Sequence, residues 1–487
     1  MDILPPIPLA AVVVWPFLGA IAIGLAAGRP KLRDTLCWFV PLPFFVGVLA
    51  QIGPVVDDQT TRQVLFNLVP GPDIAFSLRP LGLLFALLAS SLWLVATPYA
   101  LGYMKKGGYA SLGRFMACYT IALGAAAGIA FADDLLTLYI FYEILSVSTY
   151  PLVAHTGTDK ARGGARTYLA VLLATSVGLL LPAIITTWHI AGTLRLAEGG
   201  LLAGEAGPVM GSILLVLFIL GTGKAAVMPF HRWLPAAMVA PTPVSALLHA
   251  VAVVKAGVFV VLTVAMYVFG LEYLASLATA TPLLYLGVFT MLAASVVALQ
   301  QDNLKARLAY STVSQLAYIV VGALLANQWA AIGGGMHMLM HGFGKITLFF
   351  CAGAIYVTTH KTLVSEMDGL GRRMPFTMLA FLVGAVCVIG LPPTGALWSK
   401  WHLIRGALDA AHYPVVAAFA VSTLLNIGYL LPPALRAFLR PPRDQHRGGM
   451  EEAPALCVVP LCVTAFGTLV LFALAAPVAS LLGSGLG

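Results

Sequence analysis

Residues 221–261, GTGKAAVMPFHRWLPAAMVAPTPVSALLHAVAVVKAGVFVV, contain the features that decide the fold. One apolar run leads into this stretch and another leaves it, and between them lie Pro229, Pro235, Pro241 and Pro243. A proline inside a helix removes a backbone hydrogen bond and clashes with the preceding turn. Backbone freed in this way at membrane depth is tolerated only where it is buried in protein or lines a wet cavity. The stretch therefore predicts a broken membrane helix inside a larger bundle.

Apolar runs of similar length recur along the whole chain. Each is about 20 residues long, which is enough to cross the roughly 30 Å hydrocarbon core of a bilayer. We predict fourteen spans, near residues 7–28, 34–53, 79–102, 113–131, 133–154, 165–189, 208–229, 242–268, 280–300, 307–325, 329–356, 376–404, 412–437 and 455–482.

The composition agrees with a chain that lies mostly in lipid. Of the 487 residues, 60% are hydrophobic and only 9% are charged, whereas a soluble domain carries about 25% charged residues. The formal charge of +8 is spread over short loops and forms no tract that would grip nucleic acid. The sequence thus predicts an all-α integral membrane protein of about fourteen transmembrane helices, with residues 1–487 forming a single transmembrane domain.

The positions of the basic residues test this topology. With fourteen spans the loops alternate between the two sides, and one set of loops holds 19 of the 27 lysines and arginines. The opposite set holds four: Arg62, Arg79, Arg195 and Arg405. Because cytoplasmic loops carry an excess of basic residues, the first set is predicted to be cytoplasmic. We therefore expect a multi-pass protein of the bacterial inner membrane with both termini on the outer side.

Five charged residues fall inside the predicted spans: Glu143, Lys224, Lys255, Lys345 and Lys400. A lysine at the centre of a membrane helix costs about 2.5–3.5 kcal/mol on insertion scales. The five together cost on the order of 10 kcal/mol, comparable with the stability of a typical fold. Such groups persist where they face a wet interior, pair with one another or carry the function. The alternative is that a lysine near a helix end extends its side chain to the lipid headgroups. This alternative applies most to Lys400, which follows a predicted helix break.

A buried lysine beside a carboxylate can load and release protons. Desolvation favours the neutral amine, while a nearby carboxylate favours the charged form. Movement of Glu143 toward or away from Lys224 would therefore change how tightly Lys224 holds its proton. Glu143 lies in LYIFYEILSVSTYPL, residues 138–152.

Histidines extend this set of residues. His337, His341 and Lys345 follow one another at intervals of four residues and so share one helix face, and His249 lies six residues before Lys255. A proton path is favoured, because histidine titrates near neutral pH. A zinc site and purely structural hydrogen bonding are the alternatives. We expect neither a metal nor a cofactor, since no cysteine or carboxylate is placed to complete a metal site.

A second break is predicted in GLPPTGALWSKW, residues 390–401, where Pro392 and Pro393 precede Lys400. In both breaks a lysine lies within eight residues of the prolines. Paired interrupted helices in two parts of a chain are typical of transporters built from inverted repeats.

The motifs together resemble a known family. The stretch 221–261 is accompanied by FYEILSVSTYPLV at 141–153, DNLKARLAYSTVSQLAYIVVGAL at 302–324 and HMLMHGFGKITLFFCAGAIY at 337–356. These closely resemble the antiporter-like subunits of respiratory complex I. The same subunit type occurs in Mrp-type multisubunit cation/proton antiporters and in membrane-bound hydrogenases and formate hydrogenlyases. The resemblance covers about residues 75–440.

This resemblance implies fourteen helices with two inverted five-helix repeats, at 113–268 and 280–437, flanked by 1–112 and 438–487. It also implies that the seventh and twelfth helices are broken.

The family's functional residues fall on matching positions of this sequence. The matches are Glu143 on the fifth helix, Lys224 on the seventh, His249 on the eighth segment, Lys345 after the eleventh-helix histidines and Lys400 on the twelfth. Sibling membrane subunits, membrane lipid, protons and sodium ions are the implied partners.

The leading hypothesis is an ion-translocating subunit that moves protons, with sodium exchange as one form of it, as in the D-type subunit of an Mrp-type cation/proton antiporter. The alternatives are a proton-pumping subunit of an NADH-quinone oxidoreductase-like complex or hydrogenase, a structural membrane subunit, and a transporter of a solute such as bicarbonate. The sequence shows no catalytic chemistry of its own, so any redox reaction would reside in other subunits.

Overall fold

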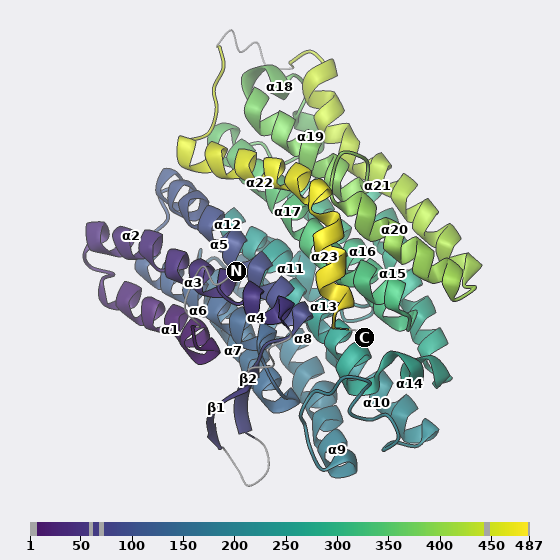
Figure 1. Cartoon of the computed structure of the whole chain (residues 1–487). Helices are drawn as coiled ribbons and strands as arrows, with labels where there is room; N and C mark the ends of the chain where they lie inside the picture. Colours follow the sequence, from purple (N-terminus) through teal and green to yellow (C-terminus); the bar gives the residue numbers. More distant parts are fainter. Residues whose placement is uncertain (1–6, 58–61, 68–72, 443–448, 486–487) are drawn as a thin grey trace.

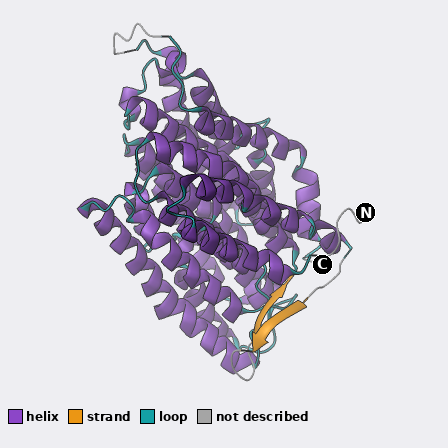
Figure 2. Cartoon of the chain, turned by 90° about the vertical axis from the view of Figure 1, so that its left-hand side faces the viewer, coloured by secondary structure: helices purple, strands orange, loops and turns teal. Residues whose placement is uncertain are grey.

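The computed structural model describes residues 7–57, 62–67, 73–442 and 449–485. Helices make up most of this part of the chain (Figures 1 and 2). Its one sheet is an antiparallel hairpin of β1 (Arg62–Asn67) and β2 (Asp73–Ser77). The α-helices are α1 (Leu9–Leu25), α2 (Pro30–Phe39), α3 (Pro41–Leu49), α4 (Ile52–Val56), α5 (Pro80–Lys106), α6 (Leu112–Ala130), α7 (Leu135–Val153), α8 (Asp159–Thr175), α9 (Leu181–Ala191), α10 (Pro208–Gly221), α11 (Trp233–Ala236), α12 (Thr242–Ala246), α13 (Val253–Thr263), α14 (Leu271–Ser276), α15 (Ala280–Gln300), α16 (Leu304–Leu324), α17 (Gln328–Thr359), α18 (Leu370–Arg373), α19 (Pro375–Ile389), α20 (Ala396–Asp409), α21 (Tyr413–Leu439), α22 (Ala455–Ala473) and α23 (Ala475–Gly483).

The predicted fold class is confirmed. In the described residues, ten helical segments are long and apolar enough to cross a membrane, and three shorter apolar helices, α1, α10 and α19, accompany them. Large apolar side chains lie exposed on the outer helices, such as Val209, Leu424 and Phe466. Such a surface is suited to lipid or to partner helices rather than to water. The count of fourteen spans stays a prediction.

The chain is interrupted at both predicted proline-rich stretches. In the first, α10 ends at Gly221, a single 3₁₀ turn η2 (Gly223–Ala225) follows, and irregular backbone containing Pro229 leads to α11. Pro235 lies inside the short helix α11, beyond the interruption. In the second, α19 ends at Ile389 and α20 begins at Ala396, with Pro392 and Pro393 between them.

Two turns of the chain repeat one pattern of backbone contacts. Before α7, Leu135 donates its N–H to the Leu194 carbonyl, while the Asp133 carbonyl accepts from Leu196. Before α16, Leu304 donates to the Thr362 carbonyl.

The second turn completes the pattern, because its Asp302 carbonyl accepts from Val364. The residue before each helix, Asp134 or Asn303, also caps that helix with its side chain. The first turn lies beside Arg62, Arg79 and Arg195, and the second lines a pocket with Lys160 and Lys361. Three of the four basic residues predicted for the outer loops thus lie at one place, and some of those predicted for the cytoplasmic loops lie at another.

Two long segments form the centre of the molecule. One is α12–η4–α13–η5, in which η4 (Leu247–Val251) and η5 (Val264–Phe269) are π-helical, and the other is α17. The first is buried along its whole apolar length.

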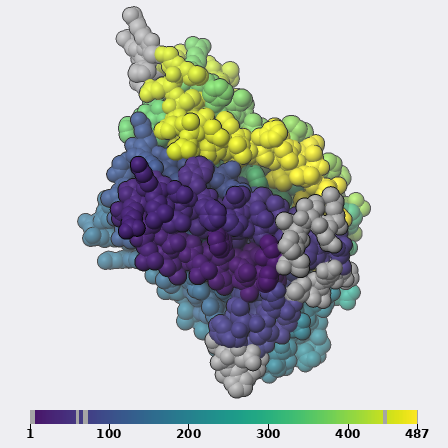
Figure 3. Space-filling model, turned by 60° about the vertical axis from the view of Figure 1, so that its left-hand side comes forward, coloured from purple at the N-terminus to yellow at the C-terminus, as the bar shows by residue number. Residues whose placement is uncertain are grey.

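At the surface, the N-terminal helices and the C-terminal helices α22 and α23 lie side by side on one face (Figure 3). The expected positions of the two termini concern residues 1–6 and 486–487, which lie outside the described residues.

Candidate functional site

Lys224 lies at the first interruption, in the turn η2, and is fully buried. Its Nζ donates to the Tyr142 carbonyl oxygen at 2.9 Å and to Ser146 Oγ at 2.6 Å. The same ammonium lies 3.1 Å from the centroid of the Tyr142 ring. A cation over an aromatic face is attracted by the ring quadrupole. Lys224 is therefore held against α7, the helix that carries Glu143.

Glu143 does not form an ion pair with Lys224. Both of its carboxylate oxygens are buried, and neither has a hydrogen-bond partner among the described residues. Leaving a buried polar group unsatisfied costs about 1–3 kcal/mol, and more for a charged group. A carboxylate in this position is stabilised by water, by a proton or by approach of the lysine.

Close packing of backbone connects the Lys224 turn to the next buried lysine. η2 lies directly against α13 at Gly257, where a Cβ atom would collide with the backbone of Lys224 and Ala225. Glycine is needed here because it alone leaves room for so close an approach. Lys255 is two residues away on the same helix.

Lys255 begins a chain of connected polar side chains in the centre of the bundle. Its Nζ lies 2.7 Å from His341 Nδ1, within hydrogen-bond distance. The rings of His341 and His337 are stacked, with centroids 5.8 Å apart. His337 Nδ1 lies 2.9 Å from Ser399 Oγ, and its Nε2 lies 3.1 Å from Gln315 Oε1.

The chain continues to Lys400 at the second interruption. Ser399 is its neighbour on α20, and the Lys400 ammonium lies 4.8 Å from the Tyr318 ring, which also stacks on His337. Lys400 donates to the carbonyl oxygen of Ile389, the last residue of α19, at 2.8 Å. Lys400 is 6% exposed and so does not reach the headgroups as an extended surface lysine would.

Two predicted residues lie beside this chain. Lys345 points to α16, where it donates to Ser311 Oγ at 2.8 Å. His249 is fully buried against Phe349, with ring centroids 4.9 Å apart, and neither of its ring nitrogens has a partner among the described residues. Polar atoms of this kind, including His341 Nε2 and Gln315 Nε2, are where ordered water binds in protein interiors.

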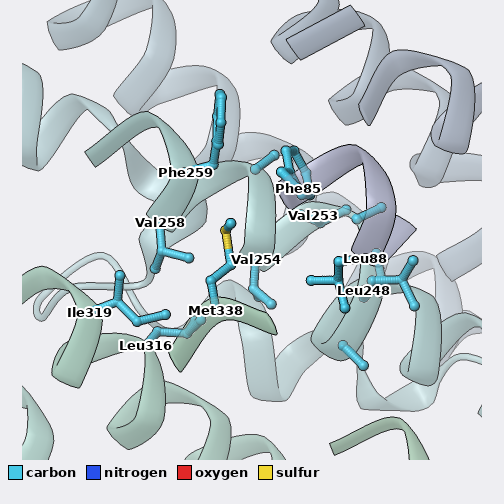
Figure 4. Close-up of a cluster of buried hydrophobic side chains, with 14 of the residues drawn as sticks. Phe85, Leu88, Leu248, Val253, Val254, Val258, Phe259, Leu316, Ile319 and Met338 are labelled. Carbon is cyan, nitrogen blue, oxygen red and sulfur yellow. The ribbon is translucent and has the colours of Figure 1, made fainter. Parts of the chain in front are cut away.

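The structure thus brings Lys255, His341, His337 and Lys400 into one row, linked partly by hydrogen-bond distances and partly by ring contacts, and places Lys224 one helix contact away. None of the four predicted lysines forms an ion pair with a carboxylate in the described part of the chain. Apolar side chains of α5, η4, α13, α16 and α17 pack together in a buried cluster (Figure 4).

Sequence reasoning missed the side chains that link the charged residues, above all Ser146, Ser311, Ser399 and Gln315. Serine is common in membrane helices and by itself gives no signal. Gln315 could have been noticed, because an amide inside a predicted span needs hydrogen-bond partners.

Comparison with known proteins places these residues in a described family. The family model "NADH:quinone oxidoreductase/Mrp antiporter, TM" matches residues 132–426. NADH-quinone oxidoreductase subunit N of Desulforudis audaxviator (strain MP104C) is 32% identical over 442 residues, which cover 87% of each chain.

A second relative is the A/B-type component of a probable K(+)/H(+) antiporter of Rhizobium meliloti (strain 1021). It is 31% identical over 82% of this chain, and the match covers only 40% of that longer protein. The fold is similar to that of a chain in the Mrp complex of Dietzia sp. DQ12-45-1b, with a TM-score of 0.85 and 21% identity over 98% of this chain and 97% of the other.

Proposed function

Because the chain belongs to the NADH:quinone oxidoreductase/Mrp antiporter family of membrane subunits, we propose that it translocates protons within a multisubunit complex. The proposed relay consists of Glu143, Lys224, His249, Lys255, His337, His341, Lys345 and Lys400. Sibling membrane subunits of that complex are its expected partners.

The observation that carries this proposal is the row of buried polar side chains from Lys255 to Lys400. In this row, Lys255 and His341 and also His337 and Ser399 lie within hydrogen-bond distance, while the rings of His341 and His337 stack. Protons move along such a chain when neighbouring groups are within hydrogen-bond distance or are bridged by water. A scaffold subunit would gain nothing from a row of buried lysines without carboxylate partners, because each of them costs stability.

Within the relay, Glu143 is proposed to control how Lys224 loads and releases its proton. At about 4 Å, an ion pair of unit charges is worth roughly 4 kcal/mol at an effective dielectric of 20. Forming or breaking the pair would therefore change how tightly Lys224 holds a proton. In the open form of this pair, Lys224 is bound to Ser146, and Glu143 has no partner among the described residues.

We propose an Mrp-type cation/proton antiporter, in which this chain takes the role of the D-type subunit, as the parent complex, and exchange of protons for sodium ions as its activity. The chain would lie in the bacterial inner membrane with both termini outside. A proton-pumping subunit of an NADH-quinone oxidoreductase-like complex is the second candidate. It is favoured by the match to subunit N, which covers 87% of both chains.

The proposal is tested by breaking the relay at one ring. His337→Phe keeps an aromatic ring that can stack on Tyr318 and His341, but it can neither donate nor accept a hydrogen bond. We expect proton flux per assembled complex, measured in proteoliposomes with a pH-sensitive dye, to fall at least tenfold.

His402→Phe is the matched control, because His402 lies on α20 beside Trp329 and outside the relay. Its flux should equal that of the unmodified complex. Unchanged flux in the His337→Phe complex would contradict the proposed relay.

A further inference from the structure

A pocket of about 330 Å³ lies beside the capped turn that precedes α16. Lys160, Lys305 and Lys361, from three separate segments, line it together with Tyr103 and Tyr356. The positive-inside rule predicts that this pocket faces the cytoplasm. The sequence placed Lys305 in a loop, but it lies in the first turn of α16 and is partly buried.

Lys305 is fixed at a discontinuity in the backbone. Its Nζ donates to the Ala240 carbonyl oxygen at 2.7 Å. Ala240 lies between the 3₁₀ turn η3 (Ala237–Val239) and α12, next to Pro241. The ammonium group is thereby held over the start of the buried segment that carries His249.

A row of polar side chains leads inward from this point. Thr242, Ser245 and His249 follow one another at intervals of three and four residues, so they lie on one side of α12 and η4. All three are buried. Thr242 also lines the pocket, and its hydroxyl donates to Tyr103 Oη at 3.3 Å.

Deeper in the row, Ser245 Oγ and both ring nitrogens of His249 have no partner among the described residues. A water held by Ser245 would complete a connection from the pocket to His249, because buried polar groups without protein partners are the usual water sites.

We propose that Lys305 is the residue that takes up protons from the pocket and passes them, through water at Ser245, to His249. In this step the Lys305 ammonium gives its proton to the water, and that water gives one of its own protons to a His249 ring nitrogen. Solvent in the pocket then restores the proton on Lys305, so the net change is one proton moved from solvent to His249. This inference rests on the proposed proton-translocating function and adds the entry residue to it.

Two substitutions at Lys305 separate proton uptake from a structural role. Lys305→Arg keeps a positive charge and a donor for the Ala240 carbonyl, but arginine stays protonated and cannot release its proton. In Lys305→His the side chain is shorter and reaches less far toward the Ala240 carbonyl, but the imidazole can load and release a proton near neutral pH. We expect proton flux per assembled complex to fall at least tenfold in Lys305→Arg and to stay within about threefold of normal in Lys305→His. A purely structural role predicts the reverse order.

Ser245→Ala should also slow the flux, because it removes the hydroxyl that would hold the bridging water. Lys160→Arg is the control, since Lys160 lines the same pocket but is exposed and lies outside the proposed row. Its flux should be unchanged.

The outcomes distinguish this inference from the proposed function. Normal flux in Lys305→Arg, together with loss of flux in His337→Phe, would overturn the role of Lys305 and leave the relay intact. Normal flux in both variants would overturn both.

Discussion

At the residue scale, the proposed relay depends on which groups each buried lysine contacts. Lys224 is bound by Tyr142 and Ser146, while the carboxylate of Glu143 on the same helix has no partner among the described residues. Two charges that could pair are therefore kept apart by a hydroxyl and a carbonyl that compete for the lysine. We propose that a movement of η2 or α7 exchanges one set of partners for the other.

The first prediction concerns this pair. Glu143→Gln removes the charge but preserves the shape, so the complex should assemble while proton flux falls at least tenfold. The double variant Glu143→Gln/Lys224→Ala should lose about as much as either single variant, because residues that act as one unit are not additive. Flux and the amount of assembled complex are measured together. Additive losses would indicate two independent roles.

Some of these residues could be predicted from the sequence and others could not. Glu143, Lys224, Lys255 and Lys345 stand out because a charge inside an apolar run is costly wherever the helix lies. Their partners, such as Ser146 and Ser311, do not stand out, since a partner is defined only when two distant helices meet.

At the scale of the elements, the interruptions and the outer hairpin position the relay. Pro229 and the Pro392–Pro393 pair could be predicted as breaks, because their effect on a helix is local. The π-helical turn η4, which carries His249, could not be predicted, since it depends on packing against α17 and α5.

The hairpin is joined to the bundle by Asp133, a buried carboxylate between α6 and α7. Arg62 of β1 donates to it at 2.7 Å, Arg79 at 3.1 Å, and Arg195 lies 3.5 Å away. Burial raises the pKa of Asp133, but hydrogen bonds and charges from the arginines outweigh this and hold the pKa below its usual value. The ion pairs therefore stabilise the fold above the ordinary carboxyl pKa, and their contribution is lost as the pH falls through the lower value of the folded state.

The second prediction follows from this arrangement. Asp133→Asn should destabilise the protein by roughly 1–3 kcal/mol near pH 7, because it removes the partner of several arginine donors. The melting temperature in detergent measures this. The difference from the unmodified protein should begin to shrink below about pH 4, where the carboxyl of the unfolded chain takes up a proton, and should vanish as the pH falls through the lower pKa of the folded state. Asp73→Asn is the control, since Asp73 pairs with Arg62 at a partly exposed site and should cost less. A difference that stays constant with pH would contradict the ion-pair explanation.

At the scale of the whole molecule, the two capped turns before α7 and α16 make matching backbone contacts at two distant places. We propose that they mark equivalent points of two inverted repeats, at 113–268 and 280–437. The sequence suggested this symmetry through the two proline-rich breaks and the family resemblance, but not through these contacts, because they involve residues such as Leu194 and Thr362 that carry no recognisable motif.

The third prediction tests the orientation. Single cysteines replacing Asp159, at the start of α8, and Glu205, between α9 and α10, lie at opposite ends of the α8–η1–α9 segment, in which η1 (Ser176–Leu180) is π-helical. The native cysteines would first be replaced. In intact cells a membrane-impermeant maleimide should label the cysteine at position 205 and not the one at position 159. Labelling of both from outside would contradict the topology.

The central claim is that a proton carried by Lys224 crosses the membrane through this chain, and one variant tests it most directly. Lys224→Arg preserves the charge, the donors for Tyr142 and Ser146 and the contact with the Tyr142 ring, but arginine does not release its proton at physiological pH. The measurement is proton flux per assembled complex in proteoliposomes. We expect normal assembly with flux reduced at least tenfold. Flux equal to that of the unmodified complex would contradict the claim.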